Sequence, residues 1–185
     1  MRIIQLLLLW LLVLCGVQAC SFRSTQLDLL MSAFNGSDET TVPYEELAWT
    51  MLWSGNDYRL MPIFPTDMSV TNFMDREGEV IVSFDGWQVV RADGVLPSEL
   101  NITIEKTDTG LEYSSEDDVF ATHVCEEFAS TLEGQTTVWL QNCDSPEGPY
   151  TNEIRVNGSG SITFLRFLIH PRYPMLTLTP NNLLF

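Results

Sequence analysis

Turn sequences divide this chain beyond Tyr58 into short strands, and this punctuation constrains its fold more than any other feature. Apolar and polar residues alternate there with a period of two, and turn residues recur at 75–78, 85–86, 108–110 and 157–160. The pair at 85–86, Asp-Gly, is a strong hairpin signal. The pattern predicts a mainly β fold with nine or ten antiparallel strands, arranged as a meander that forms a β-sandwich or an open barrel.

Two short helices are predicted before the strands. The first has apolar residues at helical spacing, namely Leu27, Leu30, Met31 and Phe34. The second begins at Pro43, a favourable residue for a first helical turn, and its apolar stripe comprises Tyr44, Leu47, Ala48 and Met51. Ser54-Gly55 is expected to end this second helix.

The first 19 residues have the composition of a secretory signal peptide. Arg2 precedes an apolar run from Ile3 to Cys15, and small residues follow before Cys20. A transmembrane anchor is the alternative, but the run is shorter than the roughly 20 residues that span a bilayer. Residues 20–185 are then the mature protein, of a length typical of one domain.

Cys20 is the predicted lipidation site. Val17-Gln18-Ala19-Cys20 resembles a bacterial lipobox, although Gln18 departs from the usual small residue, and an ordinary signal peptidase would also accept Ala19. Several acyl chains on one cysteine form a stable membrane anchor. Ser21 is not an aspartate, so we expect the mature chain to sit in the outer membrane and to face the periplasm.

The charge of the chain excludes some partners. Removal of 1–19 takes away one base, Arg2, and leaves 8 basic against 25 acidic residues, a net charge of −17. A surface of this sign repels nucleic acid and anionic membranes. No nucleic-acid partner is therefore expected, and the charge is also in keeping with a simple role in solubility.

Cys125 and Cys143 are predicted to form a disulfide. They lie on the two arms of an expected hairpin, 119–128 and 136–142, whose turn falls near Gly134. Antiparallel pairing would bring the two cysteines opposite each other, and an exported protein meets an oxidising compartment. Cys15 leaves with the signal peptide and Cys20 is assigned to the lipid.

The sequence contains no recognised catalytic motif, and neither an enzyme activity, a metal nor a cofactor is expected. His123 and Cys125 share one face of a strand, which would suit half a metal site or a nucleophile pair, but a structural histidine beside a disulfide is the simpler interpretation. The acidic runs 116–118 and 126–127 lack the spacing of a calcium loop. A pair of glycosidase carboxylates can be judged only from geometry.

Three tryptophans are candidate contact residues for a ligand or partner: Trp53, Trp87 and Trp139. Exposed aromatic rings on one face of a sheet would stack on sugar rings. Aromatic residues of β domains are more commonly part of a core or an interface, so both interpretations stay open.

Two stretches, 85–100 and 150–171, resemble the group 4 capsule polysaccharide lipoprotein family, also called YjbF-like lipoproteins. The first ends a strand in Arg91 before Gly94 and Leu96, and the second begins Tyr-Thr-Asn-Glu at Tyr150 and closes in Ile169-His-Pro. The run from Pro174 to Pro180 also fits. Two departures are Ile154-Arg155, where the family tends to have aromatic residues, and Thr179, where it commonly has a basic one.

The resemblance implies a non-catalytic outer-membrane lipoprotein that assists the export of capsule or another exopolysaccharide and contacts other secretion proteins. A second hypothesis is a periplasmic domain that binds polysaccharide directly through exposed aromatic residues. A periplasmic hydrolase is a third, and it requires two facing carboxylates in a cleft.

Overall fold

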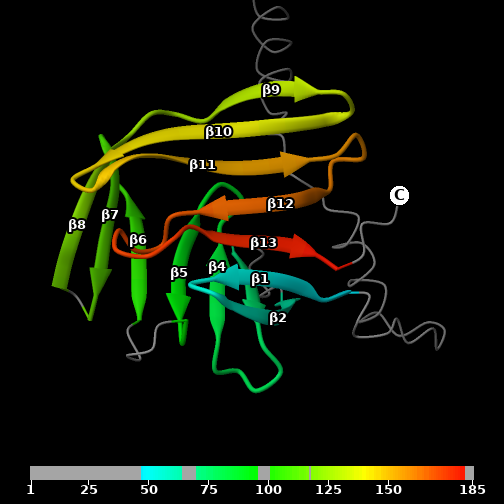
Figure 1. Cartoon of the computed structure of the whole chain (residues 1–185), viewed down its shortest axis with the longest axis horizontal. Helices are drawn as coiled ribbons and strands as arrows, with labels where there is room; N and C mark the ends of the chain where they lie inside the picture. The colour runs from blue at the N-terminus through cyan, green and yellow to red at the C-terminus, as the bar shows by residue number, and fades with distance from the viewer. Residues whose placement is uncertain (1–46, 64–69, 96–100, 117, 182–185) are drawn as a thin grey trace, which may run out of the picture.

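Thirteen β-strands account for most of the part of the chain that the structure describes. The computed structural model describes residues 47–63, 70–95, 101–116 and 118–181 (Figure 1). The strands are β1 (Trp49–Trp53), β2 (Asn56–Ile63), β3 (Thr71–Met74), β4 (Ile81–Phe84), β5 (Val89–Asp93), β6 (Ile102–Lys106), β7 (Gly110–Ser115), β8 (Asp118–Cys125), β9 (Ala129–Glu133), β10 (Thr136–Ser145), β11 (Gly148–Val156), β12 (Ile162–Phe167) and β13 (Leu176–Pro180). Within these ranges no helix has the length and apolar character needed to cross a bilayer.

The strands form one antiparallel sheet that closes on itself. β1 to β8 pair in sequence order, β8 pairs with β10, and β10 to β11, β12, β13 and finally β1 complete a ring of twelve strands. β9 lies outside this ring, against the same edge of β10 that meets β8. The predicted antiparallel meander is confirmed, and the sheet is a closed barrel in place of the expected sandwich or open barrel.

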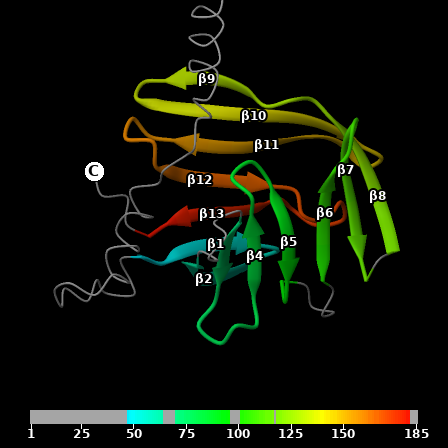
Figure 2. The same cartoon turned by 180° about the vertical axis from the view of Figure 1, so that it is seen from behind.

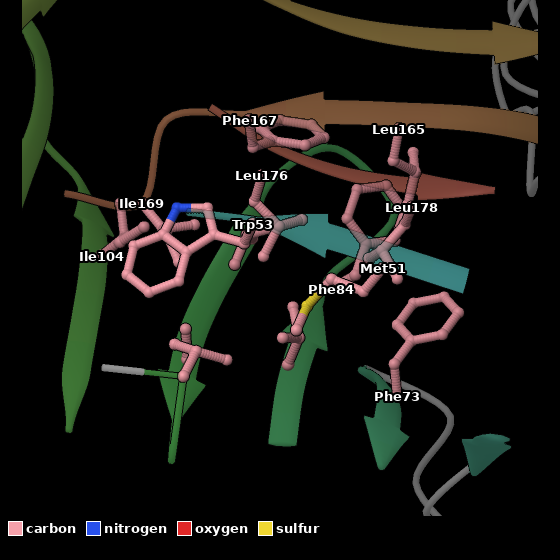
Figure 3. Packing of buried hydrophobic residues seen from close by; sticks show 14 of the residues in the cluster. Met51, Trp53, Phe73, Phe84, Ile104, Leu165, Phe167, Ile169, Leu176 and Leu178 are labelled. Atoms are coloured by element: carbon pink, nitrogen blue, oxygen red, sulfur yellow. The ribbon is translucent and has the colours of Figure 1, made fainter. Parts of the chain in front are cut away.

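The barrel is flattened into two layers. β9 to β13 and β1 run across one layer, and β4 to β8 run across the other in a different direction (Figures 1 and 2). Inward-facing side chains of both layers fill the space between them, among them Met51, Trp53, Phe84, Phe167 and Leu178 (Figure 3). Each of these five side chains is buried, so the barrel interior is a packed hydrophobic core.

The second predicted helix is wrong over residues 49–53. Residues 49–53 form β1, and Ser54-Gly55 makes a two-residue hairpin turn to β2 with positive φ angles of 52° and 82°. Trp49, Met51 and Trp53 alternate inward with the period of a strand, a pattern that competes with the helical spacing ending at Met51. The turn and this alternation together decide for a strand. The helix predicted at 27–34, and residues 43–46 of the second, lie outside the described residues.

The four predicted turns are confirmed. They connect β3 to β4, β4 to β5, β6 to β7 and β11 to β12. The expected arm 119–128 is interrupted, since β8 ends at Cys125 and β9 begins at Ala129. The irregular segment between them separates β9 from β8, and β9 pairs with the first half of β10 across the turn at Gly134.

A disulfide joins Cys125 to Cys143 at the seam of the barrel, as the sequence predicts. The two cysteines are directly opposite each other, with Cα atoms 4.1 Å apart. Only one other residue pair, Val124 with Asp144, is in register between β8 and β10. The covalent bond therefore reinforces a pairing of only two residue pairs, as short as that between β5 and β6.

Replacement of both cysteines with serine should lower the free energy of unfolding by about 3 kcal/mol, because the bridge restricts the unfolded chain between residues that are 18 apart in sequence. Urea denaturation of wild type and of the Cys125→Ser/Cys143→Ser variant measures the change, and hydrogen exchange should accelerate first along β8. Wild type treated with a reducing agent is the control and should match the variant. An unchanged denaturation midpoint in both would contradict a stabilising role for the bridge.

Candidate functional site

Four separate segments enclose a partly open pocket where the two layers meet. It has a volume of about 290 Å³, near the lower end of the range for small-ligand sites. The β4–β5 turn, the end of β6, the segment after β8 and the middle of β10 supply its walls. The lining residues are Asp85, Trp87, Gln88, Lys106, Glu127, Phe128, Trp139 and Gln141.

Three aromatic rings make the apolar side of this pocket. Trp87 meets Trp139 edge-on, with ring centroids 5.1 Å apart and planes at 83°, and it meets Phe128 at 5.7 Å. Trp87 remains 40% exposed, whereas Phe128 and Trp139 are half-buried against the core. The cluster thus offers a wet aromatic surface on a fixed base.

The Asp85-Gly86 turn holds Trp87 in place. One carboxylate oxygen of Asp85, Oδ1, accepts hydrogen bonds from the backbone N–H groups of Trp87 and Gln88, both at 2.8 Å. The Asp85 N–H donates to the Gln88 carbonyl at 3.0 Å, and Gly86 has a φ of 99°. Side chain and backbone together fix the turn, so Trp87 is presented at little further cost in conformational entropy.

Two amide side chains form part of the polar lining. Gln88 and Gln141 are largely buried. The Gln141 Oε1 accepts a hydrogen bond from the Asn152 side chain at 3.0 Å, and Asn152 in turn accepts one from the Leu168 backbone N–H at 3.1 Å. Gln141 is therefore oriented by a chain of hydrogen bonds that starts at Leu168, directly after the end of β12.

An ion pair at the rim completes the lining. The Lys106 ammonium lies 3.2 Å from a Glu127 carboxylate oxygen, and both side chains are mainly exposed. Such a pair contributes only about 0–1 kcal/mol. A ligand with hydroxyl groups can therefore compete for either partner at small cost.

The two carboxylates of the pocket, Asp85 and Glu127, each already contact another group of the protein. Asp85 accepts the turn hydrogen bonds, and Glu127 faces Lys106. Among the described residues no three His, Cys, Asp or Glu side chains gather closely enough to hold a metal ion. What remains is a constellation of rings, amides and charged rim groups, which suits the binding of a small polar ligand with apolar faces.

The structure brings together two of the three predicted contact tryptophans. Trp87 and Trp139 share the pocket, but Trp53 is 2% exposed and belongs to the core (Figure 3). The Trp53 indole N–H donates to the Pro174 carbonyl at 2.8 Å, and its ring packs on Tyr173 at 5.1 Å. The prediction of a contact role for Trp53 is wrong, because β1 points this residue inward.

Sequence reasoning missed Phe128, Gln88, Gln141 and Lys106 as site residues. Gln88 and Trp87 lie next to the strong hairpin signal, which was the one available hint. The remaining three come from different strands and segments, and no spacing along the chain marks them. Cys20, the predicted lipidation site, lies outside the described residues.

His123 belongs to a separate buried hydrogen-bonded cluster. Its Nδ1 lies 2.8 Å from the Tyr150 hydroxyl, which lies 3.0 Å from the Tyr113 hydroxyl, and Tyr113 donates to the Leu168 carbonyl at 3.3 Å. When the proton of neutral His123 is on Nδ1, His123 donates to Tyr150, Tyr150 donates to Tyr113 and Tyr113 donates to the Leu168 carbonyl, so all three bonds are satisfied. We assign that tautomer, which leaves the buried Nε2, an atom with no partner here, as a bare acceptor. Cys125 is committed to its disulfide, so the two residues form no nucleophile pair.

Burial sets the pKa values in this cluster. It lowers the pKa of His123, and it raises the pKa of Tyr150 to about 12 and that of Tyr113 further. All three groups are therefore neutral near pH 7. A proton added to His123 would be placed on Nε2 in a site that offers it no partner.

Acid should destabilise the fold through His123. Because its pKa is lower in the folded state, the unfolded chain binds the proton first, and stability should fall as the pH drops below about 6.5, by at most about 1.4 kcal/mol per unit. Urea midpoints measured between pH 8 and 5 test this. His123→Gln should flatten the decline.

The second histidine serves as the matched comparison. Burial also lowers the pKa of His170, but this residue is half-buried at the surface. His170→Gln should keep most of the decline. A decline that is the same in His123→Gln as in wild type would rule out the assigned role of His123.

The chain matches no family model, no curated protein and no solved structure. The resemblance to capsule polysaccharide lipoproteins therefore stays a prediction, and the geometry of the Trp87–Trp139 pocket is the main evidence for function.

Proposed function

We propose that this protein is a non-catalytic, exported glycan-binding domain that assists exopolysaccharide secretion. The observation that carries the proposal is the pairing of Trp87 with Trp139 in a pocket that also contains oriented amides. Sugar rings have apolar C–H faces and a rim of hydroxyl groups. Indole rings can stack on the apolar C–H faces. Gln88, Gln141 and the ion pair at the rim can form hydrogen bonds with the hydroxyl groups.

The site suits binding better than turnover. Asp85 and Glu127, the carboxylates of the pocket, are engaged by turn N–H groups and by Lys106. A glycosidase needs one carboxylic acid to donate a proton and a second carboxylate to act opposite it. The contacts of Asp85 and Glu127 favour holding and orienting a ligand.

The sequence supplies the proposed location. A lipid at Cys20 would tether the domain to the outer membrane, on its periplasmic side, where nascent polysaccharide passes. The stretches 85–100 and 150–171, with their likeness to capsule polysaccharide lipoproteins, favour the same setting. The first of these stretches contains Asp85, Trp87 and Gln88, three residues of the pocket.

A second candidate function is the binding of other secretion proteins without any binding of sugar. Exposed apolar side chains on β8 favour it, namely Val119, Phe120 and Val124. Scattered surface hydrophobics are common in monomeric proteins, so this observation is weaker than the aromatic pocket.

Trp139→Ala should abolish most glycan binding, because this half-buried ring supports the exposed Trp87. We expect affinity to fall by about tenfold or more, as for a central aromatic contact. The measurement is titration calorimetry of the mature chain with neutral gluco-, galacto- and manno-configured tetrasaccharides. Trp87→Ala should have a similar effect.

Phe120→Ala is the matched control, since it removes a partly exposed ring on β8 outside the pocket. It should bind like wild type. Absence of binding by wild-type protein to every tetrasaccharide would refute the proposal. Capture of secretion proteins that depends on Phe120, and not on Trp139, would instead support the second candidate.

A further inference from the structure

A second depression adjoins the aromatic pocket on the outside of the barrel. It has a volume of about 810 Å³ and extends over β3 to β6. Asp85, Gln88 and Lys106 line both hollows. The two are therefore neighbouring parts of one surface feature.

A row of polar side chains crosses the floor of this depression. Strand register places Asn72 opposite Ser83, Ser83 opposite Arg91, and Arg91 opposite Thr103. Their neighbours Phe73, Val82, Ala92 and Ile102 are buried in the core, so alternation turns the row to the outer face. Figure 2 shows β4, β5 and β6, which carry most of the row, side by side.

The row has the length and chemistry for an extended ligand. Three steps between strands cover about 14 Å. The Ser83 hydroxyl donates to the Asn72 side-chain oxygen at 2.7 Å, which orders these two groups as hydrogen-bonding partners. Ser83 itself is only 6% exposed, so the Asn72 amide, the Arg91 guanidinium and the Thr103 hydroxyl are the groups that can contact a chain lying across the strands.

The charge of the groove indicates a neutral ligand. Two cations line the two hollows, Arg91 and Lys106, and each is ion-paired, Arg91 with Asp93 at 2.7 Å and Lys106 with Glu127. Asp85 and Glu105 add negative charge to the lining. A polyanion would meet paired cations, these carboxylates and a chain of net charge −16.

We infer that the aromatic pocket is one end of a groove that binds several consecutive units of a neutral glycan chain, with the row Asn72–Ser83–Arg91–Thr103 as its other end. This inference rests on the proposed glycan-binding function and adds the ligand's length and charge. The aromatic end stacks one or two sugar rings, and the polar row holds the units that follow.

Chain-length dependence tests the inference. Neutral oligosaccharides of two to six units, in the configuration that binds best, are titrated against wild type and Thr103→Tyr. Affinity of wild type should rise by about tenfold or more from the disaccharide to the hexasaccharide. Thr103→Tyr fills the groove and should remove this gain while it leaves disaccharide affinity unchanged.

Thr122→Tyr is the matched control, because Thr122 is an exposed strand threonine on β8 outside both hollows. It should retain the full gain with length. Equal affinity for all lengths in wild type would overturn the groove and leave the pocket proposal standing. Tighter binding of a polyuronate than of the neutral hexasaccharide would overturn the assigned charge, and binding of none of these glycans would overturn the proposed function itself.

Discussion

The double pairing of β10 is the constraint on which the structure depends. This strand meets β11 along one edge and both β8 and β9 along the other. It therefore closes the ring, carries one half of the disulfide at Cys143, and places Trp139 and Gln141 against the β4–β5 turn. Without closure at β10, Trp139 and Gln141 would lie near one edge of an open sheet, several strands away from the β4–β5 turn.

The stretch 150–171, for which the sequence predicts a likeness to capsule polysaccharide lipoproteins, has structural roles in this molecule. Tyr150 bonds to His123, and Asn152 orients Gln141 from the neighbouring strand. Glu153 is nearly buried and forms ion pairs with Arg155 and Arg166 at 2.5 and 3.0 Å. A buried carboxylate requires such partners. Of these residues, Asn152 supports the pocket through Gln141, and none of the three lines it.

Features that depend on residues adjacent in the sequence were predicted correctly, whereas features that depend on contacts between distant strands were not. Hairpin turns such as Asp85-Gly86 are encoded by adjacent residues, so strand order and the opposition of Cys125 and Cys143 follow from the sequence. The helix expected from Pro43 fails over 49–53 because its stripe also fits a strand, and pairing of β1 with both β2 and β13 decides between the two. The same inward alternation removes Trp53 from the surface.

The sequence by itself determined an antiparallel β meander, its turns and the disulfide, because local propensity and pattern encode them. It also determined the strong negative charge, which follows from composition. Tertiary structure alone decided that the sheet closes, and that Trp87 and Trp139, 52 residues apart in the printed sequence, meet edge-on beside Phe128. The physical reason is that closure brings strands distant in sequence into contact. A binding site assembled across that closure has no signature in any single segment of the chain.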